Sequence, residues 1–409
     1  EALAALRRNL DNVRLAWEWA IDGRQIAELS SAARPLEMLY RFSGLLAEGA
    51  QAFAAAAEAL AVGLDRGELD PPATLPLIHT LWRREALLRE LRGDGAAAVA
   101  LLERTRAGWT ALGDQRRLAQ TLNDLAYVHI RRGQGDVARD SARAALALGR
   151  ELGDDELIAD ALHNLGNIAG TAEDLRPAES QLRESIDLYQ RAGGRLLAGA
   201  LCDLGRVLVQ KGDLEEGRAT VARGLAVAEA AGDQPAIVLA LTALGGSALS
   251  AGDLAAAEVY SRRGQVGAQE IGDTFMLCIC LGNLGHVALA RGEHAAFQLY
   301  RDALGLSLAA DIAGTTYEAV VGLASLAADS VPASGARWLA ATETWRTTYG
   351  FHANEEPFLR ALRHGAAARL RSALDKANFT AAWDRGAALS LEMAAAQASA
   401  WAADKMYGT

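Results

Sequence analysis

The glycines and lysines of this chain do not form a nucleotide-binding motif. A phosphate loop needs glycines spaced before Lys and Ser or Thr, so that backbone amides and the ammonium group surround the phosphates. No Gly-Lys dipeptide occurs in the 409 residues. The nearest glycine-rich candidate is Gly133-Gln134-Gly135, and it occupies a turn that recurs along the chain. The sequence therefore predicts that the chain contains no ATPase and binds no cofactor.

The histidines, serines and cysteines also lack catalytic or metal-binding spacing. There is no His-Glu-x-x-His, Cys-x-x-Cys or Gly-x-Ser-x-Gly motif. His294 follows a turn and is predicted at the surface, whereas His79 and His129 are interpreted as packed or edge residues. Cys278 and Cys280 would point about 200° apart on a helix. We therefore predict no metal site, no enzymatic activity and a reducing, cytoplasmic compartment.

A basic cluster near the carboxyl end leaves two interpretations open. It could be a binding face, or its side chains could contact neighbouring carboxylates, which is the commoner role of such charges on a helix. We favour the second. The cluster comprises Arg360, Arg363, His364, Arg369 and Arg371.

Composition favours helix and disfavours polyanionic partners. Hydrophobic residues make up 51% of the chain but aromatic residues only 6%, so most of the apolar content is Ala, Leu and Val. The formal net charge of −10 would repel nucleic acid and anionic membranes. No apolar run approaches the length of a membrane span.

Glycine and leucine recur with a period of about 40 residues. One glycine series closes each unit and a second marks a turn in its middle; a leucine followed by Gly or Ala repeats in phase with both. The three series are Gly113, Gly153, Gly193, Gly232 and Gly272; Gly93, Gly133, Gly212, Gly252 and Gly292; and Leu125, Leu165, Leu204, Leu244, Leu284 and Leu323. The unit around Thr171 lacks the middle glycine.

Each unit therefore contains two amphipathic helices of about 16 residues. Neither helix can bury its apolar stripe alone, so neighbouring units must stack and share one continuous core. The small residue after each leucine lets the first helix lie close to its partner. The predicted fold is all-α, with no period-2 run long enough for a strand.

This spacing resembles the tetratricopeptide repeat, in a form longer than the usual 34 residues. The segments LHNLGNIAG, LCDLGRVLVQKGDLEEG and LGNLGHVALARGEHAAF are close to the family pattern. The resemblance implies a right-handed superhelix over residues 73–350. We assign residues 1–72 to irregular amino-terminal helices, with a linker at Gly67–Pro76, and residues 351–409 to a carboxyl-terminal helical cap.

Both ends resemble bacterial STAND proteins, the signal-transduction ATPases with numerous domains. NLDNVRLAWEWAIDG resembles the segment that opens the repeat region in that family, and GARWLAATETWRTTYG and FTAAWDRGAALSLEMAAAQA resemble its carboxyl-terminal end. The abrupt start inside a helical pattern suggests a fragment of a longer chain. The resemblance implies a sensor array that regulates a nucleotide-binding module and an effector outside this chain.

The tetratricopeptide resemblance also implies a binding groove on the concave side, lined by the first helix of each unit. Arg206 is the residue we expect to matter most, because its planar fork can hold a carboxylate. The residues placed there are Gln120, Asn123, Tyr127, Arg131, Asp160, His163, Asn167, Cys202, Arg206, Gln210, Thr242 and His286.

Two functions remain open from the sequence. The first is a sensor that recognises a protein, peptide or small molecule in the groove and shifts a two-state equilibrium in the full-length protein. The second is a constitutive scaffold that joins protein partners. Neither involves direct contact with nucleic acid or a membrane.

Overall fold

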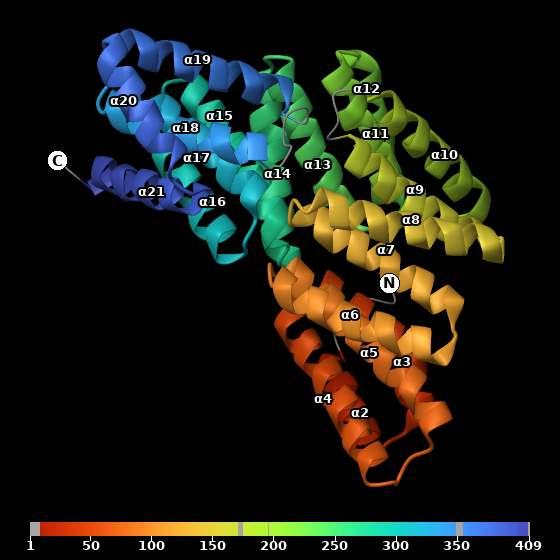
Figure 1. Ribbon diagram of the computed structural model, residues 1–409. Coiled ribbons are helices and arrows are strands. Elements are labelled where there is room, and N and C mark those ends of the chain that lie inside the picture. The colour runs from red at the N-terminus through yellow and green to blue at the C-terminus, as the bar shows by residue number, and fades with distance from the viewer. Residues whose placement is uncertain (1–8, 171–174, 195, 349–354, 408–409) are drawn as a thin grey trace.

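The computed structural model describes residues 9–170, 175–194, 196–348 and 355–407. Twenty helices and no strands occur in these ranges, which confirms the predicted all-α, tetratricopeptide-like superhelix (Figure 1). The first eight residues, the turn at Thr171, where the middle glycine was expected to be missing, and the predicted array end at Gly350 lie outside the described residues. Within the described part of the chain, no helix is long and apolar enough to cross a membrane.

Consecutive helices pack as antiparallel pairs. The pairs are α3 (Ile26–Phe42) with α4 (Leu46–Asp65), α5 (Pro71–Leu91) with α6 (Gly95–Leu112), α7 (Gln115–Arg131) with α8 (Gly135–Leu152), α9 (Asp155–Ala169) with α10 (Arg176–Ala192), α11 (Leu197–Lys211) with α12 (Leu214–Ala231), α13 (Gln234–Ser250) with α14 (Leu254–Ile271), α15 (Thr274–Ala290) with α16 (Ala295–Ala309), and α17 (Ala313–Ala327) with α18 (Pro332–Thr348). Helix α2 (Leu10–Asp22) precedes them, and α19 (Pro357–Ala373), α20 (Lys376–Ala387) and α21 (Leu391–Tyr407) follow.

The repeating Gly-Asp dipeptides both end one helix and begin the next. Gly153 closes α8 in the left-handed region, with φ of 63°, which glycine adopts without a side-chain penalty. Asp154 then caps α9 by accepting a hydrogen bond from the backbone N–H of Leu157 at 3.2 Å. Gly272 and Asp273 repeat this arrangement between α14 and α15. Each turn is therefore fixed locally, which is why the period is visible in the sequence.

The predicted linker at residues 67–76 is too long. Helix α5 begins at Pro71, so only residues 66–70 separate it from α4. Asp70 is extended, as is typical of a residue before proline, and Pro71 fits the first helical turn because its missing N–H would have no partner there. The proline pair therefore starts a helix rather than marking a flexible connection.

Glycine permits close helix packing where it was predicted to do so. A Cβ atom added at Gly205 of α11 would lie 2.6 Å from the carbonyl oxygen of Gly217 in α12, and one added at Gly217 would lie 2.7 Å from that of Gly205. The two backbones therefore approach to a distance that no larger residue allows.

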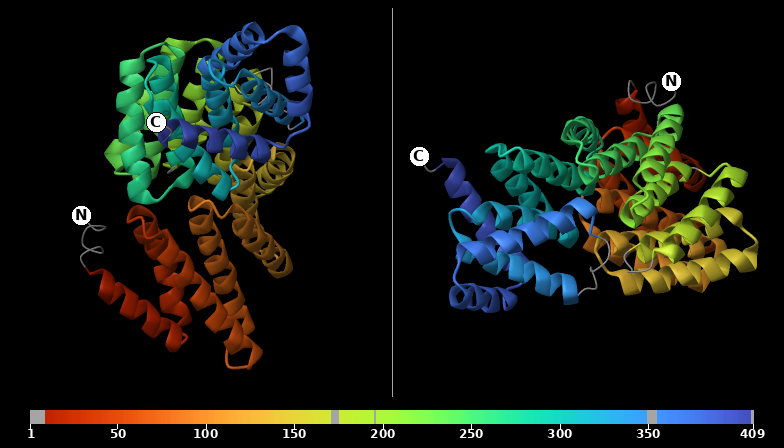
Figure 2. Two further views of the ribbon diagram at one scale, coloured as in Figure 1. Left: turned by 90° about the vertical axis from the view of Figure 1, so that its left-hand side faces the viewer. Right: turned by 90° about the horizontal axis from the view of Figure 1, so that it is seen from above.

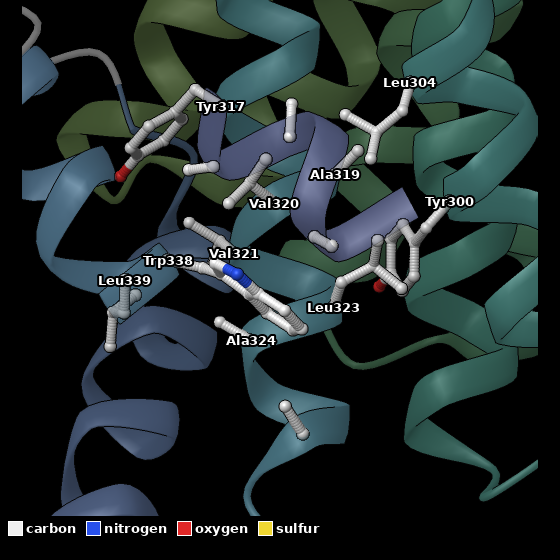
Figure 3. Close-up of a cluster of buried hydrophobic side chains, with 14 of the residues drawn as sticks. Tyr300, Leu304, Tyr317, Ala319, Val320, Val321, Leu323, Ala324, Trp338 and Leu339 are labelled. Atoms are coloured by element: carbon white, nitrogen blue, oxygen red, sulfur yellow. The ribbon is translucent and has the colours of Figure 1, made fainter. Parts of the chain in front are cut away.

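The carboxyl-terminal helices close the hydrophobic core of the last pairs. Helix α19 packs against α17, α20 packs against α18, and α21 crosses α16, α17 and α18. Figure 3 shows Trp338 of α18 beside Val321 and Ala324 of α17. The same cluster takes in four fully buried alanines of α21, which are Ala394, Ala395, Ala398 and Ala402. These helices cover apolar surface that a further pair would otherwise cover.

The superhelix returns to contact itself. In Figure 1 the ends of the amino-terminal helices lie against the near ends of α14 and α16, and Figure 2 shows the same approach from the side. A Cβ atom at Gly44 would lie 2.3 Å from the carbonyl oxygen of Glu270, and one at Gly93 would lie 2.5 Å from Ala310 Cβ. Residues about 200 positions apart in the sequence are therefore in direct contact.

Candidate functional site

The first helices of the pairs form one continuous surface, which we call the inner face. Helix α7 contacts α9, α11 contacts α13, α13 contacts α15, and α15 contacts α17. Helix α19 contacts both α13 and α17, so its beginning lies along the same face. Polar side chains of α9 and α11 meet at the middle of this face.

Asp203 of α11 is the centre of that polar cluster. Its Oδ2 lies 2.8 Å from His163 Nε2 and accepts a hydrogen bond from Asn167 Nδ2, also at 2.8 Å. The amide oxygen of Asn167 accepts a hydrogen bond from Arg206 Nη2 at 3.2 Å, and Arg206 Nη2 lies 3.7 Å from Asp203 Oδ1. Three of the predicted groove residues, His163, Asn167 and Arg206, are thus brought together by a residue that was not predicted.

The environment of Asp203 keeps it charged. Burial alone would raise the pKa of Asp203, but the hydrogen bonds with His163 and Asn167 and the nearby charge of Arg206 hold the pKa below its usual value. The cluster therefore presents a fixed carboxylate whose Oδ2 already has two neighbours, His163 and Asn167. What it offers to a ligand is the outward side of Arg206.

Arg206 retains unused donors. Its side chain is 27% exposed, and apart from the contacts to Asn167 and Asp203 its N–H groups form no hydrogen bond with the described residues. Burial raises the pKa of Glu356, which precedes α19, to about 7, although the positive charge of Arg206 acts to lower it. Burial also raises the pKa of Glu318 on α17 to about 8, with a further contribution from the charge of Glu356. A guanidinium and two carboxyl groups therefore share this part of the inner face.

Four other predicted groove residues are not open to a ligand. Asn123 is buried and donates to the carbonyl of Leu157 at 3.4 Å, and Thr242 is buried and donates to the carbonyl of Val238 at 2.6 Å. Cys202 is 1% exposed, and His286 is enclosed beside Tyr300. The prediction that these four side chains line an open groove is corrected, because each is buried against neighbouring helices of its own or an adjacent pair.

Arg131 is buried for a different reason. It lies in the contact between the two parts of the superhelix, where it reaches Asp273 at 3.1 Å. Its Nη1 also donates to Tyr127 Oη at 2.8 Å. Arg131 therefore belongs to a long-range contact and not to an open inner face.

The remaining predicted residues keep partial exposure. Tyr127 is 36% exposed. Asp160 accepts a hydrogen bond from Tyr189 Oη at 2.6 Å, and Gln120 and Gln210 are half-buried. These residues stay candidates on the inner face.

Asp203 could have been found from the period. It directly precedes one of the recurring leucines, Leu204, as Asp124 precedes Leu125. Asp124 accepts from Arg83 Nη2 at 3.2 Å, and the asparagines at two equivalent positions donate to the preceding unit, Asn164 to the carbonyl of Asn123 and Asn283 to that of Thr242. The position before the leucine thus holds adjacent units in register.

Three arginines of the basic cluster on α19 contact other residues of the chain. Arg363 pairs with Glu355 and Glu343, Arg369 with Asp329, and Arg371 lies over the ring of Phe379. The predicted contacts to neighbouring carboxylates are therefore confirmed for Arg363 and Arg369.

The contacts and exposure of the described histidines and cysteines do not indicate a metal site. His79 packs edge-on against Trp109, His129 Nδ1 lies 2.6 Å from Gln134 Oε1, and His294 is exposed. Cys278 and Cys280 are buried towards different helices, α16 and α13, and are free thiols. Among the described residues, no group of three or more His, Cys, Asp or Glu side chains has the geometry of a metal site.

Comparison with known proteins agrees with the fold. Residues 117–191, which span α7 to α10, match the family model of the tetratricopeptide repeat. No curated protein shows significant sequence similarity to the chain.

Solved structures share the architecture at low sequence identity. A Rap protein complexed with competence and sporulation factor superposes with a TM-score of 0.63 at 14% identity, over 93% of this chain and 99% of its own. Aspartyl phosphate phosphatase F from Bacillus subtilis gives 0.48 at 13%, over 83% and 93%. A STAND protein with a tetratricopeptide repeat sensor from Pyrococcus horikoshii gives 0.43 at 13%, over 83% and 55%. The first of these similarities supports a tetratricopeptide-like fold along most of the chain.

Proposed function

We propose that the chain is a recognition domain that binds a protein or peptide on its inner face, with Arg206 as the central contact. The observation that carries the proposal is the guanidinium of Arg206, which Asn167 orients while its remaining donors stay unpaired among the described residues. Such a group can hold a carboxylate through two parallel hydrogen bonds. Because the stacked helices already hold the cluster in place, little ordering entropy is lost on binding.

The fold supports a binding role over catalysis. Helix-pair solenoids present extended surfaces to partners, and a Rap protein of this architecture has been solved in complex with competence and sporulation factor. We extend peptide or protein binding to this chain as part of the proposal.

The finer proposal is that binding regulates a nucleotide-binding module and an effector in a longer protein, in the cytoplasm. It is supported by the sequence resemblance of both ends to STAND proteins. A constitutive scaffold is the alternative. One measurement distinguishes the sensor from the scaffold. In the full-length protein, a bound ligand should change nucleotide exchange or hydrolysis if the array is a sensor. It should leave both rates unchanged if the array is a scaffold.

The inner-face site is tested with a defined peptide array. Peptides with systematically placed acidic and basic residues are screened against the chain, and the tightest binder is titrated calorimetrically. We expect Arg206→Ala to weaken that binding by one to two orders of magnitude, about 1.5 to 3 kcal/mol for hydrogen bonds to a charged group. The thermal midpoint should change little, since a partly exposed ion pair contributes about 1 kcal/mol or less.

Arg223→Ala is the matched control, because Arg223 is exposed on α12, the second helix of the same pair. It should leave affinity unchanged. If Arg206→Ala lowers the thermal midpoint and spares binding, Arg206 only bridges units and the site must be sought elsewhere. If no peptide on the array binds, the peptide-binding proposal is wrong.

A further inference from the structure

The contact that closes the superhelix on itself consists mainly of charged and polar groups. Arg131 at the end of α7 lies between Glu90 of α5, 2.8 Å from its Nε, and Asp273, the residue that caps α15, 3.1 Å from its Nη2. All three side chains are only 6% exposed. Arg131 and Asp273 are 142 positions apart in the sequence. We call this set, with the neighbouring pair Arg132–Asp311, the clasp.

Further groups complete the clasp. The guanidinium of Arg131 lies 4.3 Å from the ring centroid of Phe275, the favourable geometry for a cation over an aromatic face. Arg132 Nη2 lies 3.0 Å from Asp311 Oδ2. Thr274 donates to the carbonyl of Arg92 at 3.4 Å. Residues of both sides, among them Arg131 and Ala310, also line a small cavity of about 10 Å³.

The clasp has little hydrophobic support. The apolar residues on the amino-terminal side belong to clusters within α2 to α9, and those on the other side belong to clusters within α13 to α21. None of the hydrophobic clusters of the described residues includes members from both sides. The two surfaces are therefore not held together by a shared apolar core, which is what normally makes an interface permanent.

A buried ion cluster on its own makes a weak closure. Removing charges from water costs free energy that their mutual attraction only partly repays, so the net contribution of such a cluster is small. When the two surfaces separate, Arg131, Glu90 and Asp273 each regain water, which offsets part of the attraction lost between them.

We propose that the clasp is a reversible latch that sets the curvature of the superhelix, closing it into a ring and opening it by small rotations at the stacked helix pairs. Each interface between pairs needs to rotate only slightly, because the changes add along the solenoid. This latch does not depend on what, if anything, the inner face binds.

The latch is tested by removing its central charge. In Arg131→Gln, Glu90 and Asp273 face each other without the cation, and the closed state should be lost. We expect the radius of gyration from small-angle X-ray scattering to rise by on the order of 1 Å or more. Amide hydrogen exchange at residues 92–95 and 270–275 should become about tenfold faster or more, with circular dichroism unchanged.

Two further variants separate a latch from general destabilisation. Arg116→Gln is the matched control, because Arg116 lies on the same helix and pairs with Asp154 between adjacent units, outside the clasp. It should change neither quantity. The triple variant Arg131→Met, Glu90→Gln, Asp273→Asn removes every charge of the cluster together and should restore closure, since Asn can still cap α15.

The proposal is overturned by either of two results. If Arg131→Gln keeps the radius of gyration and the local exchange rates of the unmodified chain, the contact does not open. If the variant lowers the thermal midpoint while its radius of gyration stays constant, the cluster is a structural contact and not a latch.

Higher salt should favour the open state in the unmodified chain, because exposed charges are stabilised by counterions.

Discussion

At the scale of single residues, His286 shows how burial decides chemistry. Its Nδ1 is hydrogen-bonded to Tyr300 Oη at 2.8 Å, its Nε2 has no partner among the described residues, and its ring packs against Phe358. Burial lowers its pKa to about 3, so the ring is neutral in the folded chain at ordinary pH. A histidine that looks reactive in the sequence is therefore a packed core residue.

The pH dependence of local stability follows from His286. Between pH 6.5 and 3 the unfolded chain binds a proton that the folded chain does not, so stability is lost as pH falls through this range. Lowering the pH from 7 to 5 should destabilise α15 and α16 by about 2 kcal/mol. Native-state hydrogen exchange of these helices measures it. His286→Gln should show a flatter pH dependence, and an unchanged slope in that variant would assign the effect to other groups.

At the scale of elements, glycines in equivalent helices have opposite roles. Gly205 of α11 faces the backbone of α12, whereas a Cβ added at Gly246, in the middle of α13, meets no atom within 4 Å. Both residues are helical, with ordinary backbone angles. Helix packing requires Gly205, whereas Gly246 lowers helix stability and permits no close contact in exchange.

The two glycines make a matched pair of substitutions. Gly205→Ala should destabilise the chain by about 1 to 3 kcal/mol, because the new methyl group overlaps Val221 and the Gly217 carbonyl. Gly246→Ala should stabilise it by up to about 1 kcal/mol, the difference in helix propensity. Thermal unfolding of both variants gives the comparison. Equal effects of one sign would show that helix packing does not distinguish the two sites.

At the scale of the whole molecule, α21 and α2 bury different amounts of apolar side-chain surface. Helix α21 buries four alanines against α16, α17 and α18, whereas α2 buries only Trp17 and Ala20 and leaves Trp19 60% exposed. The carboxyl-terminal helices thus cover apolar surface of the last pairs, and their role as a cap, as expected of repeat arrays, stays a prediction.

Truncation at each end should have unequal effects. Removal of residues 391–409 exposes the core around Leu323 and Trp338 and should cause aggregation or binding of an apolar dye. Among the described residues 9–25 only Trp17 and Ala20 are buried, so removal of residues 1–25 should leave a soluble, helical chain. Size-exclusion chromatography and circular dichroism of the two variants test this difference. Equal solubility of both would contradict the capping role of α21.

The sequence by itself determined the helix pairs, their turns and their period. Gly153 and Asp154 show why, because a left-handed glycine and a capping carboxylate act within a few residues of each other and leave a local signal. The polar character of α9 and α11 was visible for the same reason. Residues such as His163, Asn167 and Arg206 could therefore be selected as a group before their contacts were known.

Only the tertiary structure decided which polar residues remain available. Arg131 and Arg206 occupy first helices of the same kind, yet Arg131 is buried against Asp273, whereas Arg206 keeps donors that pair with no described residue. The difference comes from where the superhelix meets itself, which depends on small rotations summed over many helix pairs. No local pattern records that sum. The contact between residues 142 positions apart thus follows from the geometry of the whole array.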